Sequence, residues 1–433
     1  MWHSIGLSIQ QMTLPSRLGG TGLRDPVLHH SAAFLSSFSH TMREEGWGRE
    51  ATDDDRIEAL FLPLIADIND RIVPEASALA VSSSDIAALD LFRSINLIDI
   101  VSGVCGQKAL SILNDFSSLA EIHSTDLPDP DDGCMPSPTK ESNRARRRRL
   151  ASLRAPHADA WLNALPSGDT LMHNDVFHTS LATRYGLPVY DSAGEPCSAC
   201  LEGRARKNRE EAANPSIKKR ARIPTGTQDA FGTHALNCKY GGGATRRHNA
   251  LRDGVQAAAR RGGFRAETEL YIGSDPSSRK RDGDCVIFHF EGDGCDAAVD
   301  VGVTMAGQTK FPTIPAAMGS FNRSTTFLAA KTMADIKRSN ALPRVNASIT
   351  KFHALCVDHF GAWDEDSHAF LIKLGKRIGA RTLAYNNESY GIRKLFQRLS
   401  IILQNRNHNI IDRRRPAADW RHRVEDFAYH GVI

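Results

Sequence analysis

The sequence lacks the features of a membrane or secreted protein. Its 433 residues include no run of about 18 apolar residues, the length that crosses a bilayer. Residues 1–15 have no basic segment leading into an apolar core, as a secretory signal would. The 8 cysteines are scattered and do not resemble the framework of a small disulfide-rich domain. We therefore expect a protein of a reducing compartment that is neither secreted nor inserted in a membrane.

An excess of charge of one sign is also absent, since the net charge is only +4. The basic residues are nevertheless clustered, at Arg144 with residues 146–149, at 218–222, at 279–281 and at 413–415. Such clusters are typical of nucleic-acid binding or nuclear import, although a charged run is as often a solvated loop. We expect a nuclear protein, or a cytoplasmic one before import.

Four residues in the middle of the chain have the spacing of a structural zinc site. Cys197 and Cys200 form a C-x-x-C pair, while His234 and Cys238 form an H-x-x-x-C pair. Zn²⁺ binds four such ligands tetrahedrally, and the two pairs complete that set. Four unrelated residues are one alternative; a redox C-x-x-C is another, but it leaves His234 and Cys238 unexplained. The polar residues 201–233 between the pairs can loop out at modest entropic cost.

Composition divides the chain into five parts. The sequence predicts a helical region at 1–124 with a Gly-rich turn at 14–25, a disordered basic linker at 125–150, a helical lead-in and zinc site at 151–245, an α/β domain at 246–385 and a basic C-terminal tail at 386–433. The lead-in helix is expected to stop at Gly186. The chain is thus a multidomain α/β protein.

Residues 246–385 alternate between helical and strand patterns. A helix capped by Asn249 and ended by Gly262 and Gly263 precedes three predicted strands, at 264–271, 284–290 and 297–305. A helix over 325–338, a strand over 351–360 and a helix over 367–378 follow. This order predicts an αβββαβα sandwich.

Two carboxylates stand at the predicted strands: Asp284 starts the second strand and Asp300 lies inside the third. If these strands pair through the turn at 291–294, the acids meet at one end of the sheet. Two ionised carboxylates held so close need a cation between them, and Mg²⁺ can then activate a water for attack on a phosphodiester. The alternative is two acids with purely structural roles.

Further groups can complete such a site. Glu269, or else Glu267, offers a third oxygen ligand from the preceding strand. Lys310 is assigned to hold the attacking water or the phosphate, with Lys331 and Lys337 as alternatives. We assign nucleic-acid binding to the basic residues Arg246, Arg247, His248, Arg279, Lys280 and Arg281.

Several motifs occur in a recognisable order. They are the Gly-rich residues 14–25, the segments 174–177 and 184–188, the ligands Cys197, Cys200, His234 and Cys238, the segments 247–249 and 251–253, and the acids Asp284 and Asp300. Together they resemble the C-terminal region of reverse transcriptases from non-LTR retrotransposons that carry a restriction-like endonuclease. The resemblance covers most of the chain.

The resemblance implies a thumb-like N-terminal region, a CCHC zinc knuckle and a PD-(D/E)xK endonuclease that nicks target DNA to prime reverse transcription. Asp282 departs from the Pro or neutral residue of the family, and Gly302 replaces the lysine of a D-x-K motif, so the lysine must come from elsewhere. No Tyr/Phe-x-Asp-Asp polymerase signature occurs, so we expect no polymerase activity from this chain. The implied partners are DNA, element RNA and a palm domain supplied elsewhere.

Three functions follow from these patterns. The first is a Mg²⁺-dependent DNA endonuclease module with a structural zinc. The second is a catalytically inactive, zinc-dependent nucleic-acid-binding remnant, and the third is a non-nuclease α/β domain with structural acids. The first two both predict salt-sensitive DNA binding. Only the first predicts Mg²⁺-dependent nicking.

Overall fold

The structure is a computed structural model that divides into two compact units, residues 1–128 with 313–326 and residues 129–312 with 327–433. It describes residues 11–12, 14–15, 18–21, 62–63, 65–66, 115, 119, 122, 141–214, 226–269, 283–292, 294–306, 328–342, 345, 349–381 and 387–415. In the first unit, the backbone N–H groups of Leu18 and Gly20 both donate to the Pro15 carbonyl, at 2.9 and 3.1 Å, within the predicted Gly-rich turn. Most of the helical region predicted at 1–124 lies outside the described residues.

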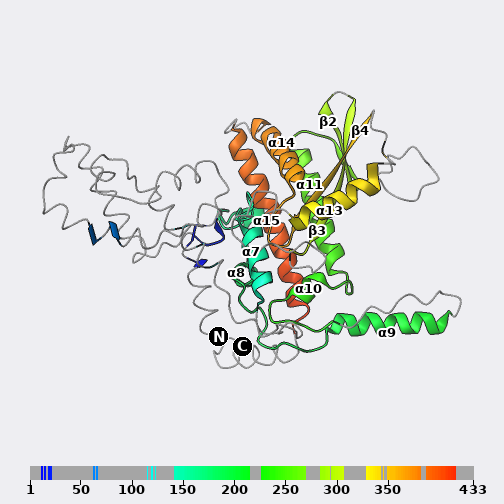
Figure 1. Cartoon of the computed structure of the whole chain (residues 1–433). Helices are drawn as coiled ribbons and strands as arrows, with labels where there is room; N and C mark the ends of the chain where they lie inside the picture. Colours follow the sequence, from blue (N-terminus) through cyan, green and yellow to red (C-terminus); the bar gives the residue numbers. More distant parts are fainter. Residues whose placement is uncertain are drawn as a thin grey trace. The chain divides into compact units, whose positions relative to one another are not determined.

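The second unit contains a four-stranded sheet (Figure 1). The strands are β1 Ala266–Thr268, β2 Cys285–Gly292, β3 Cys295–Thr304 and β4 Thr350–Asp358, in the order β1-β2-β3-β4. β2 runs antiparallel to both β1 and β3, whereas β4 runs parallel to β3. A parallel pair needs a crossover connection, and the helix α13, Leu328–Ala341, lies in that connection.

Helices pack on both faces of this sheet. On one face lie α11, Gly243–Arg261, and α14, Glu365–Arg381, whose buried residues share a core with Val299 and Val301 of β3. On the other face, α13 packs with Ala298, because successive residues of a strand point to opposite faces. The predicted order of elements, αβββαβα, is confirmed. The predicted strand at 264–271 is shorter in the structure, and Asn249 lies inside α11, which begins after Gly242 at φ 68°.

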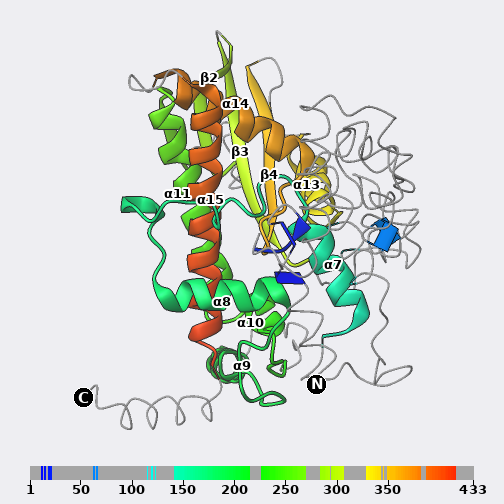
Figure 2. The same cartoon turned by 90° about the vertical axis from the view of Figure 1, so that its left-hand side faces the viewer.

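The predicted basic tail at 386–433 is wrong for the residues that the structure describes. Residues Glu388–Asp412 form α15, a 25-residue helix capped by the Asn387 side chain, which accepts the Tyr390 N–H. It packs against both α14 and α11 (Figure 2). The apolar stripe of α15 is difficult to recognise in the sequence, because charged and amide residues alternate with the buried Leu and Ile residues.

The predicted disordered linker is also wrong at its C-terminal end, since residues Asn143–Leu153 form the helix α7. Its arginines do not form a solvated loop: Arg149 is buried, pairs with Glu141 at 2.7 Å and donates to the Arg184 carbonyl. Residues 125–140 lie outside the described part of the chain. The predicted lead-in helix is confirmed as α8, Asn174–Tyr185, and it ends at Gly186 with φ 65°.

The region of the predicted zinc site packs directly on the helices beside the sheet. It contains α9, Ser198–Ala213, and the short α10, Thr233–Asn237, so the first part of the interval 201–233 is a helix and not a loop. Leu236 of α10 shares a buried cluster with Met305, just after β3, and with Ile410 of α15. The predicted boundary at 245/246 therefore does not separate two cores. Among the described residues, no helix is long and apolar enough to span a bilayer.

The crossing of α14 and α15 yields a first prediction. A Cβ on Gly375 of α14 would lie 2.6 Å from the Ile392 Cα of α15, a contact that backbone atoms cannot relieve. Gly375→Ala should therefore lower the free energy of unfolding by about 1–3 kcal/mol in urea titrations, although alanine favours an isolated helix.

The matched control is Gly254→Ala in α11. A Cβ there meets only the tips of two side chains, Ile402 Cδ1 at 2.9 Å and Leu399 Cδ2 at 3.1 Å. This variant should stay within about 1 kcal/mol of the parent protein. Equal stability of both variants would contradict the close crossing of the two helices.

Candidate metal centres

The four predicted zinc ligands lie together in the structure. One ligand atom from each of Cys197, Cys200, His234 and Cys238 lies within 4.8 Å of the others. The Cys200 Sγ is 3.5 Å from the Cys238 Sγ and 3.4 Å from the His234 Nε2, and the Cys197 Sγ is 4.0 Å from the Cys238 Sγ. A tetrahedron with zinc–sulfur bonds of about 2.3 Å has edges of about 3.8 Å. The donor set and its spacing therefore fit a zinc ion.

Short local structures position these ligands. Cys197 precedes α9 and Cys200 lies in its first turn, while His234 lies in α10 and Cys238 follows it. The two halves are joined because the Cys197 N–H donates to the Gly226 carbonyl at 2.9 Å. Gly226 must lack a side chain, since a Cβ there would overlap the His234 ring.

The thiols of this cluster affect one another's ionisation. Hydrogen bonding from Cys197, together with that from His234, outweighs burial and lowers the pKa of Cys238 to about 3. Hydrogen bonding to Cys238 and burial raise the pKa of Cys197, and burial raises that of Cys200. Three buried thiolates repel one another, so a bound cation would release the remaining protons and stabilise the closed cluster.

The second group of predicted residues is the acid pair, Asp284 and Asp300. Cys285 of β2 pairs with Val299 of β3, so this register sets Asp284 beside Asp300. Their carboxyl groups share a hydrogen bond, and each is about three-quarters shielded, with exposures of 24% and 26%. The predicted meeting of these acids is thus present in the structure.

The two carboxyl groups differ in acidity. Burial raises the pKa of Asp300 to about 6, with a further rise from Asp284 and an opposing effect of Lys337. Burial would also raise the pKa of Asp284, but hydrogen bonds from His248, Asp300 and the Val301 N–H hold that pKa at about 2. A divided pair of this kind is expected when two carboxylates share one site.

The lysine beside the acid pair is Lys337 of α13. Its Nζ lies 2.5 Å from the Asp300 Oδ1. Gly302 follows Asp300 by two residues and lies on the same face of β3, where a D-x-K lysine would stand. A Cβ at Gly302 would lie 2.8 Å from the Lys337 Cε, so the absent side chain leaves room for the lysine of the helix. Of the predicted alternatives, Lys331 is exposed and Lys310 lies outside the described residues.

The third carboxylate is not where the sequence predicts it. Glu269 is exposed and its Oε1 lies 3.0 Å from Arg252, while Glu267 pairs with Arg265. In the part of the chain that the structure describes, no third His, Cys, Asp or Glu closes a metal cluster around Asp284 and Asp300. Among the described residues, the geometry therefore provides two carboxylates as oxygen ligands for a metal ion.

The predicted nucleic-acid-binding residues have different environments. Arg247 is only 3% exposed and donates to Asn407 Oδ1 at 2.8 Å and to the Leu236 carbonyl at 3.3 Å, so its assignment to nucleic acid is wrong. Arg246 is exposed and remains available for a phosphate. Arg279, Lys280 and Arg281 lie outside the described residues.

His248 belongs to the acid pair, a role that the sequence assignment missed. Its Nε2 lies 3.2 Å from the Asp284 Oδ1. The helix α11 buries a stripe made of Gly243, Arg247, Leu251 and Val255. Residue 248 lies next to this stripe on the helix surface, and that position was the signal in the sequence that His248 contacts another part of the protein.

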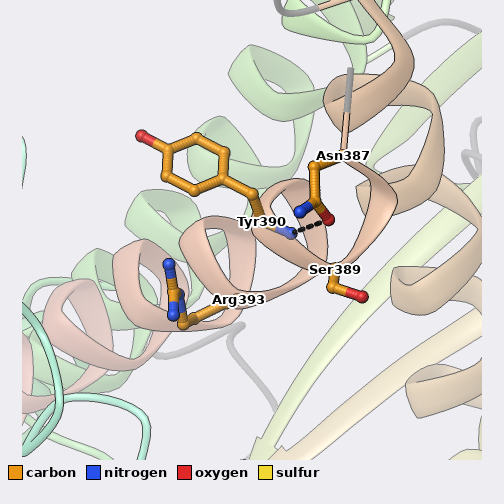
Figure 3. A pocket seen from close by; sticks show the side chains of 4 residues that line it. All are labelled: Asn387, Ser389, Tyr390 and Arg393. Atoms are coloured by element: carbon orange, nitrogen blue, oxygen red, sulfur yellow. Dashed lines mark hydrogen bonds between the residues drawn. The ribbon is translucent and has the colours of Figure 1, made fainter. Parts of the chain in front are cut away.

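A shallow hollow occurs at the start of α15, and its lining is shown in Figure 3. Asn387, Ser389, Tyr390 and Arg393 line it, and the Asn387 side chain accepts the Tyr390 N–H at 3.2 Å. None of the predicted site residues contributes to this hollow. The candidate chemistry of the described residues therefore lies at the Cys/His cluster and at the acid pair.

No protein-family model matches the chain. A search of curated proteins likewise finds no similar sequence.

The Cys/His cluster, as a candidate zinc site, gives a second prediction. The purified chain should contain one zinc ion per molecule by metal analysis, and Co²⁺ should replace it with the absorption of a tetrahedral thiolate site. Cys238→Ser should lose the metal and lower the melting temperature by at least about 5 °C, since metal binding stabilises the folded state.

The matched control is Cys295→Ser. Cys295 is a free, partly buried cysteine of β3 that lies outside the cluster. This variant should retain the zinc and the melting temperature. Metal-free wild-type protein with an unchanged melting temperature would argue against the centre.

Proposed function

We propose that this chain is a Mg²⁺-dependent DNA endonuclease module of a retrotransposon-derived protein that nicks target DNA. The observation that carries the proposal is the group formed by Asp284, Asp300 and Lys337 on an αβββαβα sheet. Two acidic ligands and a cation from another element are the groups that hydrolysis of a phosphodiester requires. The sequence resemblance to the restriction-like endonuclease region of non-LTR retrotransposons supports the same assignment.

Each residue of this group has a distinct part in the proposed reaction. Asp284 and Asp300 would hold Mg²⁺, and a bound Mg²⁺ would supply a water of lowered pKa and positive charge against the phosphate. Lys337 carries its ammonium group next to Asp300 and can orient the attacking water or stabilise the phosphate. The half-buried setting of the pair strengthens these electrostatic contacts relative to bulk water.

The zinc centre has a supporting part in this proposal. It would order the segment between α8 and α11 and thereby support the start of α11, where the exposed Arg246 can contact the DNA backbone. The protein would act in the nucleus on DNA, with element RNA and a separately supplied polymerase palm as further partners.

A second candidate function is a nucleic-acid-binding remnant without cleavage activity. The observation in its favour is the difference between the two centres: the zinc cluster has four protein ligands, whereas the described residues give the acid pair no third one. Both functions require zinc and salt-sensitive DNA binding. Cleavage separates them.

The third prediction tests cleavage directly. Supercoiled plasmid incubated with the protein at low salt should become relaxed when Mg²⁺ is present and stay supercoiled with a chelator. Asp284→Asn, Asp300→Asn and Lys337→Ala should each slow nicking by at least about 100-fold, because each removes a group that acts on the reacting phosphate or water.

Asp296→Asn is the matched control for these variants. Asp296 lies on the same strand, β3, and its Oδ1 accepts the His289 N–H at 2.9 Å, away from the acid pair. It should nick at the parent rate. Retarded but uncut plasmid with every protein, including the parent, would favour the inactive remnant.

The fourth prediction concerns the origin of the lysine. A Cβ at Gly302 would lie 2.8 Å from the Lys337 Cε, the Met333 Sδ and the Cys356 Sγ. Lys337→Ala removes the first of these contacts, so Gly302→Lys in that background can place an ammonium group near Asp300 from the strand itself once the Met333 and Cys356 side chains shift. The double variant should nick faster than Lys337→Ala alone. Gly302→Lys alone should be impaired, because its side chain would compete with Lys337 for one space. No recovery in a folded double variant would contradict the spatial equivalence of the two positions.

A further inference from the structure

The Asp284 carboxylate is held at both of its oxygen atoms. Its Oδ2 accepts the Val301 N–H at 2.8 Å, and its Oδ1 lies 3.2 Å from the His248 Nε2. The His248 side chain is 29% exposed and that of Asp284 is 24% exposed, so the contact is partly shielded but open on one side. A carboxylate fixed in this way has a defined orientation before any metal arrives.

The direction of the contact follows from the donor inventory of the two groups. An ionised carboxylate only accepts hydrogen bonds, so the His248 Nε2 must carry the hydrogen and donate it. Each carboxylate oxygen has two lone pairs. The hydrogen bonds from the Val301 N–H and from His248 use one lone pair on each oxygen, and the hydrogen bond with Asp300 uses a third, so one lone pair of the carboxylate is left for a cation.

The helix α11 fixes the position of His248. The preceding residue, Arg247, is buried and bonded to Asn407 of α15 and to the Leu236 carbonyl. Leu251 and Val255 of the same helix are fully buried in the core. The imidazole is thus presented by a rigid element, as orienting groups at metal sites generally are.

We propose that His248 is a positioning residue that orients Asp284 for Mg²⁺. This inference rests on the proposed function of the acid pair. His248 does not join Asp284 and Asp300 in a three-ligand cluster among the residues described, so its part is orientation and not ligation. Loss of a hydrogen bond to a metal ligand typically weakens metal binding roughly 10- to 100-fold.

Isothermal titration of the zinc-loaded full chain with Mg²⁺ tests this role. His248→Ala, and His248→Asn with an amide too short to reach Asp284, should both weaken Mg²⁺ binding roughly 10- to 100-fold. His248→Gln has a longer side chain that still offers an N–H donor, and it should remain within about 3-fold of the parent. The Mg²⁺ concentration for half-maximal plasmid nicking should shift in parallel, with the rate recovering at saturating Mg²⁺.

His289→Ala is the control. His289 is an exposed histidine of β2, the strand that begins directly after Asp284. It lies toward the other end of that strand, where its Nδ1 accepts the Gly294 N–H. Unchanged Mg²⁺ affinity in His248→Ala, with normal cleavage by the parent, would overturn this inference alone. An equal loss in His248→Gln and His248→Ala would overturn the donor role. A parent protein that neither binds Mg²⁺ nor cuts would remove this inference together with the proposed function.

Discussion

The helix α15 is buried around most of its circumference, so other elements of the second unit must pack on several of its sides. Leu395, Phe396 and Leu399 pack in the core of the sheet, whereas Ile410 and Ile411 pack with residues next to His234 of the Cys/His cluster. The Tyr190 hydroxyl and the Gln228 amide donate to carbonyls at the C-terminal end of the helix. Because one helix contributes to both cores, the Cys/His cluster and the sheet belong to the same compact unit.

The acid pair follows from a second constraint, the register between β2 and β3. Since Cys285 lies opposite Val299, the residues flanking them bring two carboxyl groups together on neighbouring strands. Two side chains offset the repulsion between these carboxyl groups. Lys337 of α13 pairs with Asp300, and His248 of α11 contacts Asp284. The helices on the two faces of the sheet thus each supply one group, and neither group is close to the acids in sequence.

The sequence predicted the features that depend on short-range spacing. The ligand pairs around Cys197 and His234 and the order of strands and helices could be found because each has a local pattern. Lys337 remained one of three lysines, since its proximity to Asp300 arises from the crossover packing of α13 and the absence of a side chain at Gly302. The helix α15 was missed because its polar residues gave the appearance of a charged tail.

The assignment of consecutive basic residues to nucleic acid failed for a geometric reason. Successive residues on a helix point about 100° apart, so Arg246, Arg247 and His248 cannot share one surface. In α11 they face solvent, the core and Asp284 respectively. The buried Arg247 links α11 to α10, which contains His234, and to α15, while its neighbour contacts the acid pair. One turn of α11 therefore contacts both the helix that contains His234 and the acid pair.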